Sequence, residues 1–203
     1  MKKCIALVFV LGLIFSGNLY SKENSLLDIQ EDDFFIGDLN APVTIIEYAS
    51  MSCSHCANFH NNTLEDLKKE YIDTGQVKFI FRDFPFNYPA LAGSMMMRCV
   101  SDDIRYDYMN ALYKLQNNWV FRDNAKTRAE LYKIMQTGGM KQDEFDTCLS
   151  NIDLENDLLE EVMNAQREFS IRSTPSFIIN GDLYSGNKTT KEFRQIIDKI
   201  LSQ

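Results

Sequence analysis

Two cysteines three residues apart stand where an expected β-strand gives way to an expected α-helix. Residues 43–48 are rich in β-branched and aromatic side chains, which is typical of a buried strand. Cys53-Ser54-His55-Cys56 follows at once, and apolar side chains then recur at helical spacing from Phe59 to Tyr71. Residues 77–81 predict a second strand. This order predicts a βαβ unit, which favours parallel strands.

The rest of the chain predicts a helical block followed by a return to strands. The expected helices of the block are 91–100, 106–116, 127–137, 142–149 and 152–169. The last of these carries Leu158, Leu159, Val162 and Phe169 on one expected side. Strands at 176–179 and 183–184 flank Asn180-Gly181, a strong hairpin signal, before a short final helix. Neither strand pair can bury both faces alone, so we expect one α/β domain with the helical block inserted in it.

The start of the sequence has the layout of a secretory signal. Lys2 and Lys3 precede an apolar run at 5–15, and small or polar residues fill 16–21. The run is shorter than the roughly 20 residues that span a bilayer comfortably. We therefore expect a signal peptide at 1–21 and one domain at 22–203, with its helical insertion at approximately 88–170. An uncleaved membrane anchor is the alternative, because the sequence has no clean Ala-x-Ala cleavage site.

The net charge of the sequence argues against one class of partner, nucleic acid. The formal net charge is −8, and Lys and Arg do not cluster anywhere in the sequence. Nucleic acid needs a basic surface, so we do not expect it as a partner.

The close cysteine pair has the placement of a reactive thiol site. The first turn of a helix presents unpaired N–H groups and the positive end of the helix dipole, which favour an anion. A thiolate at Cys53 gains that stabilisation, so its pKa should fall and it should act as the attacking nucleophile. Cys56 lies one turn deeper and should be the resolving thiol, while His55 adds an imidazole to the same turn.

The spacing of this cysteine pair also allows two other interpretations. Cys-x-x-Cys can be half of a zinc site, and His60, four positions after Cys56, could be a third ligand. No second Cys-x-x-Cys or His pair completes such a set, so we expect neither a metal nor a cofactor. His60 by itself is interpreted as a polar helix residue. A purely structural disulfide is disfavoured because so small a ring constrains little of the unfolded chain.

Two further features fit thiol chemistry. Glu47 interrupts an apolar strand, where a carboxylate could relay a proton during thiol exchange; a solvated charge at an edge is the alternative. Thr174-Pro175 precedes an expected strand, and a cis bond there would present the backbone of Thr174, although most X-Pro bonds are trans.

These motifs together resemble the DsbA-like thiol–disulfide oxidoreductases, which have a thioredoxin fold with a helical insertion. The most telling segments are 46–56 and 173–177. The resemblance implies that Cys53 and Cys56 form the redox-active disulfide, that His55 destabilises it, and that Glu47 is a buried acid. It also implies that Thr174 and Pro175 form a cis-proline loop that binds substrate. Ser54-His55 stands where Pro-His is commonest in the family, so the redox potential does not carry over.

The remaining cysteines, Cys99 and Cys148, both fall in the expected insertion. The resemblance to some DsbA-like relatives implies a structural disulfide between them, and the alternative is two separate buried thiols. Closing a loop of about 50 residues would add roughly 4 kcal/mol to stability.

The resulting hypothesis is a periplasmic, monomeric oxidase that donates its disulfide to reduced exported proteins. The resemblance implies a membrane partner like DsbB, linked to quinone, that reoxidises it. A disulfide isomerase or reductase of the same fold is the alternative within the enzyme class. A non-enzymatic, zinc-binding exported protein is the alternative from a different class.

Overall fold

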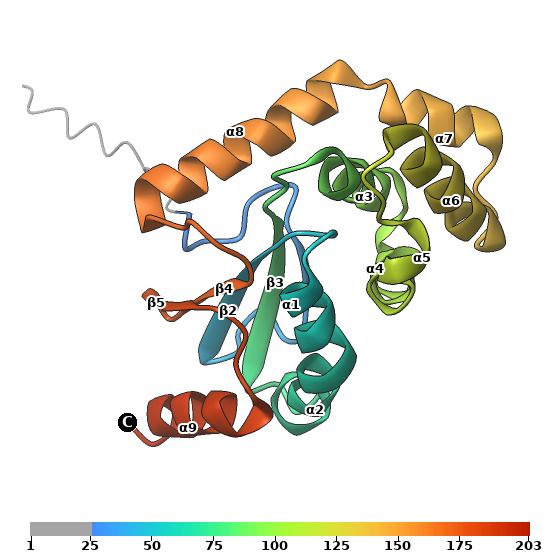
Figure 1. The fold of residues 1–203 in the computed structure, drawn as a ribbon. Coiled ribbons are helices and arrows are strands. Elements are labelled where there is room, and N and C mark those ends of the chain that lie inside the picture. The colour runs from blue at the N-terminus through green and yellow to red at the C-terminus, as the bar shows by residue number, and fades with distance from the viewer. Residues whose placement is uncertain (1–25) are drawn as a thin grey trace, which may run out of the picture.

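The computed structural model describes residues 26–203, which form one mixed sheet with helices on both faces (Figure 1). The expected signal peptide and Cys4 lie outside the described residues. The strands are β1 (Phe34–Ile36), β2 (Val43–Ala49), β3 (Val77–Asp83), β4 (Ser176–Ile179) and β5 (Asp182–Ser185). Among the described residues no helix is long and apolar enough to cross a bilayer.

The helices fall into three groups along the chain. Between β2 and β3 lie α1 (Ser54–Asn58), the π-helical turn η1 (Phe59–Thr63), α2 (Leu64–Leu67) and a second π-helical turn, η2 (Lys68–Ile72). Between β3 and β4 lie α3 (Tyr88–Cys99), α4 (Asp102–Lys114), α5 (Gln116–Trp119), α6 (Asn124–Thr137), α7 (Gln142–Leu149) and α8 (Ile152–Phe169). The chain ends with α9 (Thr190–Leu201).

The strand order is β1-β3-β2-β4-β5, with β2 at the centre. β2 and β3 run parallel, from the pair Val43–Val77 to the pair Ala49–Asp83, as the βαβ pattern predicts. The hairpin strands β4 and β5 return antiparallel, and β4 pairs with β2. The expected α/β architecture with an inserted helical block is therefore confirmed.

Each face of the sheet has its own core. On one face, alternate residues of β2, β3 and β4 pack against the helical segment that follows β2 and against α9. On the other face, Ile46, Ile80 and Ile178 pack with Ala165 of α8. A third cluster fills the helical block and reaches Met51 and Cys56. Figure 1 shows α3 to α7 gathered beyond one end of the sheet, with α8 leading the chain back towards β4.

Three local predictions differ from the structure. The short strand β1 was not expected; it pairs antiparallel with β3 at the edge of the sheet. α3 begins at Tyr88 because the Asn87 side chain caps it, accepting a hydrogen bond from the Ala90 N–H at 2.9 Å. The prediction that Leu158 and Leu159 share one side of α8 is wrong, because the Leu159 side chain is exposed while that of Leu158 is buried.

Candidate active site

Cys53 and Cys56 begin the helix that follows the central strand. Cys53 is the N-cap residue of α1 and has an extended backbone, with φ −82° and ψ 121°. Its N–H donates to the Ser50 carbonyl at 3.0 Å, and its carbonyl accepts from the Ala57 N–H at 3.0 Å. Both cysteines are free thiols in this structure. Cys53 is half-buried and Cys56 is completely buried, so only Cys53 can meet a large substrate.

The two thiols differ strongly in acidity. The pKa of Cys53 is lowered from 9.0 to about 5, chiefly because the Cys56 thiol hydrogen-bonds to it. Thr174 and the N–H groups of Cys56 and His55 lower the pKa of Cys53 further, while partial burial opposes the shift. Burial raises the pKa of Cys56, and the hydrogen bond to Cys53 and the charge of Glu47 raise it further. At neutral pH, Cys53 is therefore a thiolate and Cys56 a thiol.

A loop from the far end of the chain packs against Cys53. The Thr174–Pro175 bond is cis, as the resemblance implies, and both residues are buried. The Cys53 thiol lies 3.4 Å from the Thr174 carbonyl, to which it can donate. The loop is held in place because β4 starts at Ser176, which pairs with Tyr48 of β2. The backbone of Thr174 is thus presented beside the reactive sulfur.

His55 is exposed at the start of α1. Its backbone N–H is one of the groups that lower the pKa of Cys53. The structure places the residue in the site as predicted, whereas the expected effect of its imidazole on the disulfide stays a prediction.

Glu47 is completely buried in β2 and is paired with a histidine. Its Oε2 lies 2.9 Å from Nε2 of His60, which is itself buried in η1. The His60 ring stacks on Tyr113 of α4, with centroids 4.0 Å apart. The alternative of a solvated Glu47 at an edge is wrong, because β2 is the central strand. Proton relay by Glu47 stays a prediction.

The sequence interpretation missed two residues of this site. His60 is interpreted from the sequence as a polar helix residue, yet it is the partner of the buried acid. Two sequence features could have indicated this pair: an acid in an apolar strand, and a histidine four positions after Cys56. Gln116 of α5 donates from Nε2 to the carbonyls of Met51 and Cys53, at 3.0 and 3.1 Å. No sequence pattern pointed to Gln116, because 63 residues separate it from Cys53.

The zinc interpretation gains no support here. Within residues 26–203 no three His, Cys, Asp or Glu side chains gather so that they could hold a metal ion. His60, the candidate third ligand, is paired with Glu47.

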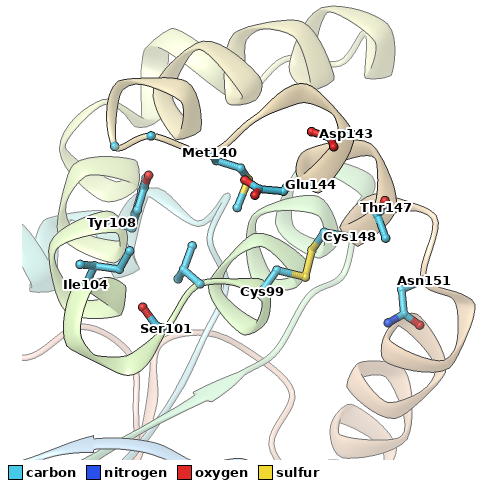
Figure 2. Close-up of a pocket in the computed structure, with 13 residues that line it drawn as sticks. Cys99, Ser101, Ile104, Tyr108, Met140, Asp143, Glu144, Thr147, Cys148 and Asn151 are labelled. Atoms are coloured by element: carbon cyan, nitrogen blue, oxygen red, sulfur yellow. A yellow bond between two sulfur atoms is a disulfide. The ribbon is translucent and has the colours of Figure 1, made fainter.

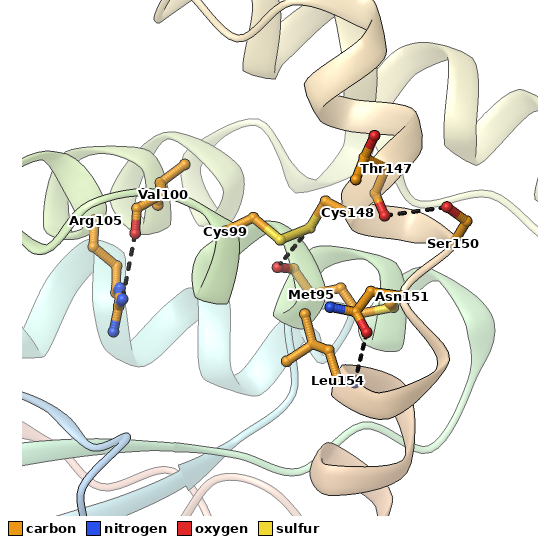
Figure 3. The surroundings of a disulfide bond; sticks show 9 residues. All are labelled: Met95, Cys99, Val100, Arg105, Thr147, Cys148, Ser150, Asn151 and Leu154. Atoms are coloured by element: carbon orange, nitrogen blue, oxygen red, sulfur yellow. Dashed lines mark hydrogen bonds between the residues drawn. A yellow bond between two sulfur atoms is a disulfide. The ribbon is translucent and has the colours of Figure 1, made fainter.

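The second cysteine pair lies in the helical block. Cys99, at the end of α3, and Cys148, in α7, form the disulfide that the resemblance implies, with Cα atoms 6.2 Å apart (Figure 3). The bond borders an open groove of about 630 Å³ between α4 and α7, into which Tyr108 and Met140 also project (Figure 2). Neither Cys53 nor Cys56 lines this groove, so the disulfide is not part of the reactive site.

Known proteins are similar to this chain in sequence and in fold. A family model described as "Thioredoxin" matches residues 30–199. A solved structure of alpha-DsbA1 from Wolbachia pipientis has a TM-score of 0.82 and 30% identity, covering 87% of this chain and 94% of that one. "Disulfide bond formation protein D" of Bacillus subtilis is 23% identical, covering 82% of this chain and 76% of the relative.

Several relatives are longer than this chain. A Rickettsia conorii protein named "Putative protein-disulfide oxidoreductase" is 29% identical over 181 residues, which cover 86% of this chain and 62% of the relative. The chain thus spans between 62% and 67% of the length of the Rickettsia proteins that it matches.

Proposed function

The chain belongs to the thioredoxin family and is one of its DsbA-like members, and we propose that it is an exported thiol–disulfide oxidoreductase that donates its disulfide to other exported proteins. The observation that carries this proposal is the difference between its two thiols. Cys53 is accessible, beside the cis-proline loop, with its pKa lowered to about 5, whereas Cys56 is buried with a raised pKa.

The reaction starts from the disulfide form. A substrate thiolate attacks Cys53 Sγ; a mixed disulfide forms, the Cys53–Cys56 bond breaks, and Cys56 takes up a proton. The second thiolate of the substrate then attacks the substrate sulfur of the mixed disulfide and releases Cys53 as a thiolate. The substrate leaves with a new disulfide, and the protein holds the two electrons. Because Cys53 is stable as a thiolate, it is a good leaving group and the reduced protein is favoured.

The cis-proline loop is proposed to bind the substrate backbone. The carbonyl of Thr174 lies beside Cys53 Sγ, where an extended peptide that approaches the sulfur would meet it. Pro175 has no N–H of its own, so the loop offers an acceptor at this position without a competing donor.

Export and reoxidation are parts of the same proposal. The basic and then apolar start of the sequence supports export to the periplasm. Membership of the DsbA-like proteins supports reoxidation by a DsbB-like membrane partner linked to quinone. The monomeric state stays a prediction. Finding the protein in a periplasmic fraction, shortened by about the first 21 residues, would support export; a full-length protein in the cytoplasmic fraction would contradict it.

The deciding experiment is the equilibrium of the Cys53–Cys56 disulfide with glutathione. We expect an oxidising potential, nearer the roughly −120 mV of DsbA than the roughly −270 mV of thioredoxin. A value near that of thioredoxin would keep the site but make the protein a reductase. Cys53→Ser should abolish exchange, and Cys56→Ser should accumulate mixed disulfides through Cys53. Full activity of Cys53→Ser would overturn the nucleophile assignment.

A further inference from the structure

Two buried nitrogen atoms near the active site have no hydrogen-bond partner among the described residues. One is Nδ1 of His60, on the side of the ring that faces away from Glu47, and the other is Nε of Arg105 in α4. A buried polar group without a partner is costly, so native structures satisfy such groups with protein atoms or with ordered water.

Both residues line one small cavity. It has a volume of about 30 Å³, is partly open, and is bordered by β3, α3 and α4. Asp83 and Arg98 also line the cavity and form an ion pair with an Nε–Oδ2 distance of 3.1 Å. A space of this size has room for roughly one or two water molecules, which need two to four polar partners each. The cavity therefore provides space for water beside the His60 ring, whose Nδ1 has no other partner among the described residues.

The chemistry of the site needs a passage for protons. Each time a substrate opens the disulfide, Cys56 leaves as a thiolate whose pKa is raised by burial, so it must gain a proton. Its side chain is completely buried, and so is that of Glu47. Neither group can exchange a proton with solvent directly.

We propose that His60 is a positioning residue that carries protons between the water-sized cavity and Glu47, which delivers them to Cys56. Nδ1 accepts a proton from water while Nε2 releases one to the Glu47 carboxylate 2.9 Å away. The net transfer is one proton from solvent to the Cys56 thiolate, and the ring changes tautomer without becoming charged. Reoxidation removes the same proton and sends it back, which restores the first tautomer. This inference rests on the proposed exchange activity.

Other charged and titratable groups surround the His60–Glu47 pair from every neighbouring element. They are Cys56 of α1, Arg82 and Asp83 of β3, Arg98 of α3, and Arg105 and Tyr113 of α4. The ring of Tyr113 stacks on His60 and holds it in plane. A profile of the exchange rate against pH would reflect the titration of all these groups together. The test must therefore change the imidazole itself.

The test replaces His60 by a smaller side chain and then restores the lost base. In a single turnover of the oxidised protein with a reduced dithiol peptide, His60→Ala should slow opening of the disulfide about tenfold at pH 7. Added imidazole should restore most of the rate, whereas pyrazole, a ring of the same size but a far weaker base, should not. The pKa of Cys53 should be unchanged. Equal rescue by both rings, or an unchanged rate in His60→Ala, would overturn the proposal.

Controls separate this role from stability and from the proposed function. Thr127→Val also removes a buried hydrogen bond, in α6, and should keep the wild-type rate. Glu47→Gln should add little to His60→Ala, because both interrupt one route; multiplicative effects would contradict a shared route. If the unaltered protein exchanges no disulfides, the proposed function fails. If the unaltered protein exchanges disulfides and His60→Ala does so at the same rate, only the inference about His60 fails.

The unaltered chain offers a second test if the variant does not fold. Heavy water should slow disulfide opening, and the rate should depend on the deuterium fraction along a curve, because several protons move in one relay. A linear dependence would mean a single proton transfer and would overturn the relay.

Discussion

Cys53 and Cys56 carry the same functional group, and their surroundings give them opposite tasks. Cys53 caps the helix, where N–H groups and a neighbouring thiol stabilise its thiolate. Cys56 is enclosed by apolar side chains one turn later, where a charge would be poorly solvated. The pair therefore holds an attacking sulfur and a resolving sulfur within a single helical turn.

The acidity of Cys53 can be measured from thiolate absorbance of the reduced protein. We expect a midpoint near pH 5, and attack on oxidised glutathione should lose its rate as pH falls through that value. Cys56→Ala should raise the pKa of Cys53, because the Cys56 thiol is the largest cause of the shift. An unchanged midpoint in Cys56→Ala would mean that the backbone N–H groups at the helix start dominate instead.

Gln116 connects the helical block to the reactive turn through hydrogen bonds. Its amide is buried and donates to the carbonyls of Met51 and Cys53. Gln116→Leu leaves these carbonyls with fewer donors in a buried place, so it should lower the free energy of unfolding by about 1–3 kcal/mol. Urea denaturation measures the loss. Gln136→Leu, at an exposed position of α6, is the matched control and should change stability by less than about 0.5 kcal/mol; equal losses would contradict a specific role for Gln116.

Site residues could be identified from the sequence where the motif that carries them is contiguous along the chain. Cys53 and Cys56 could be recognised because strand, cysteine pair and helix are contiguous. Thr174 could be recognised only through the resemblance, because it reaches Cys53 across 121 residues of chain. His60 was missed because its task depends on a partner in another element. Long-range pairing of polar side chains leaves no periodic pattern in a sequence.

Among the elements, prediction succeeded where apolar periodicity was strong. The predicted strands include β2, β3 and the hairpin strands, and they lie where expected. Both faces of β2, β3 and β4 are largely buried, so their sequences are rich in apolar residues. β1 was missed because three residues are too short to show an alternation. α8 was predicted with the right ends but one wrong facing residue. Leu158 and Leu159 are adjacent, so only one of them can point to the core.

The Cys99–Cys148 disulfide joins the end of α3 to α7 across 49 residues. Closing a loop of this length reduces the entropy of the unfolded chain, so replacing both cysteines by serine should cost about 4 kcal/mol. Chemical denaturation of the double variant, with Cys53 and Cys56 held reduced in both proteins, measures this cost. The rate of exchange at Cys53 should be unchanged, because neither cysteine lines the site. A loss below about 1 kcal/mol would mean that the unfolded chain is already compact near this pair.

At the scale of the whole molecule, the active site lies where separate parts of the fold meet. β2 and α1 supply the cysteines, the loop before β4 supplies Thr174, and the helical block supplies Gln116. A site assembled from distant segments forms only when the whole domain folds. The redox state of one disulfide is therefore coupled to the stability of the entire chain.

The lowered pKa of Cys53 determines whether the stability of the reduced protein rises or falls with pH. Folding lowers that pKa from 9.0 to about 5, so between these values the folded reduced protein holds a thiolate while the unfolded chain holds a thiol. Unfolding then takes up a proton, and stability from this group grows as pH rises above 5 and is lost as pH falls through 5. The oxidised protein has no thiol at Cys53 and lacks this contribution.

The reduced protein should therefore gain stability relative to the oxidised protein as pH rises from 5 to 8. Urea denaturation of both forms at several pH values measures the difference, whose slope should correspond to the uptake of about one proton on unfolding. Cys53→Ser cannot form the disulfide and has no thiolate at this position, so the contribution of this group to the pH dependence of stability should be absent. Stability favouring the reduced form at neutral pH means that folding pulls electrons into the Cys53–Cys56 pair, which is what a disulfide donor requires. Parallel curves for the two forms would show that the thiolate is not stabilised by the fold, and the oxidising potential would then need another source.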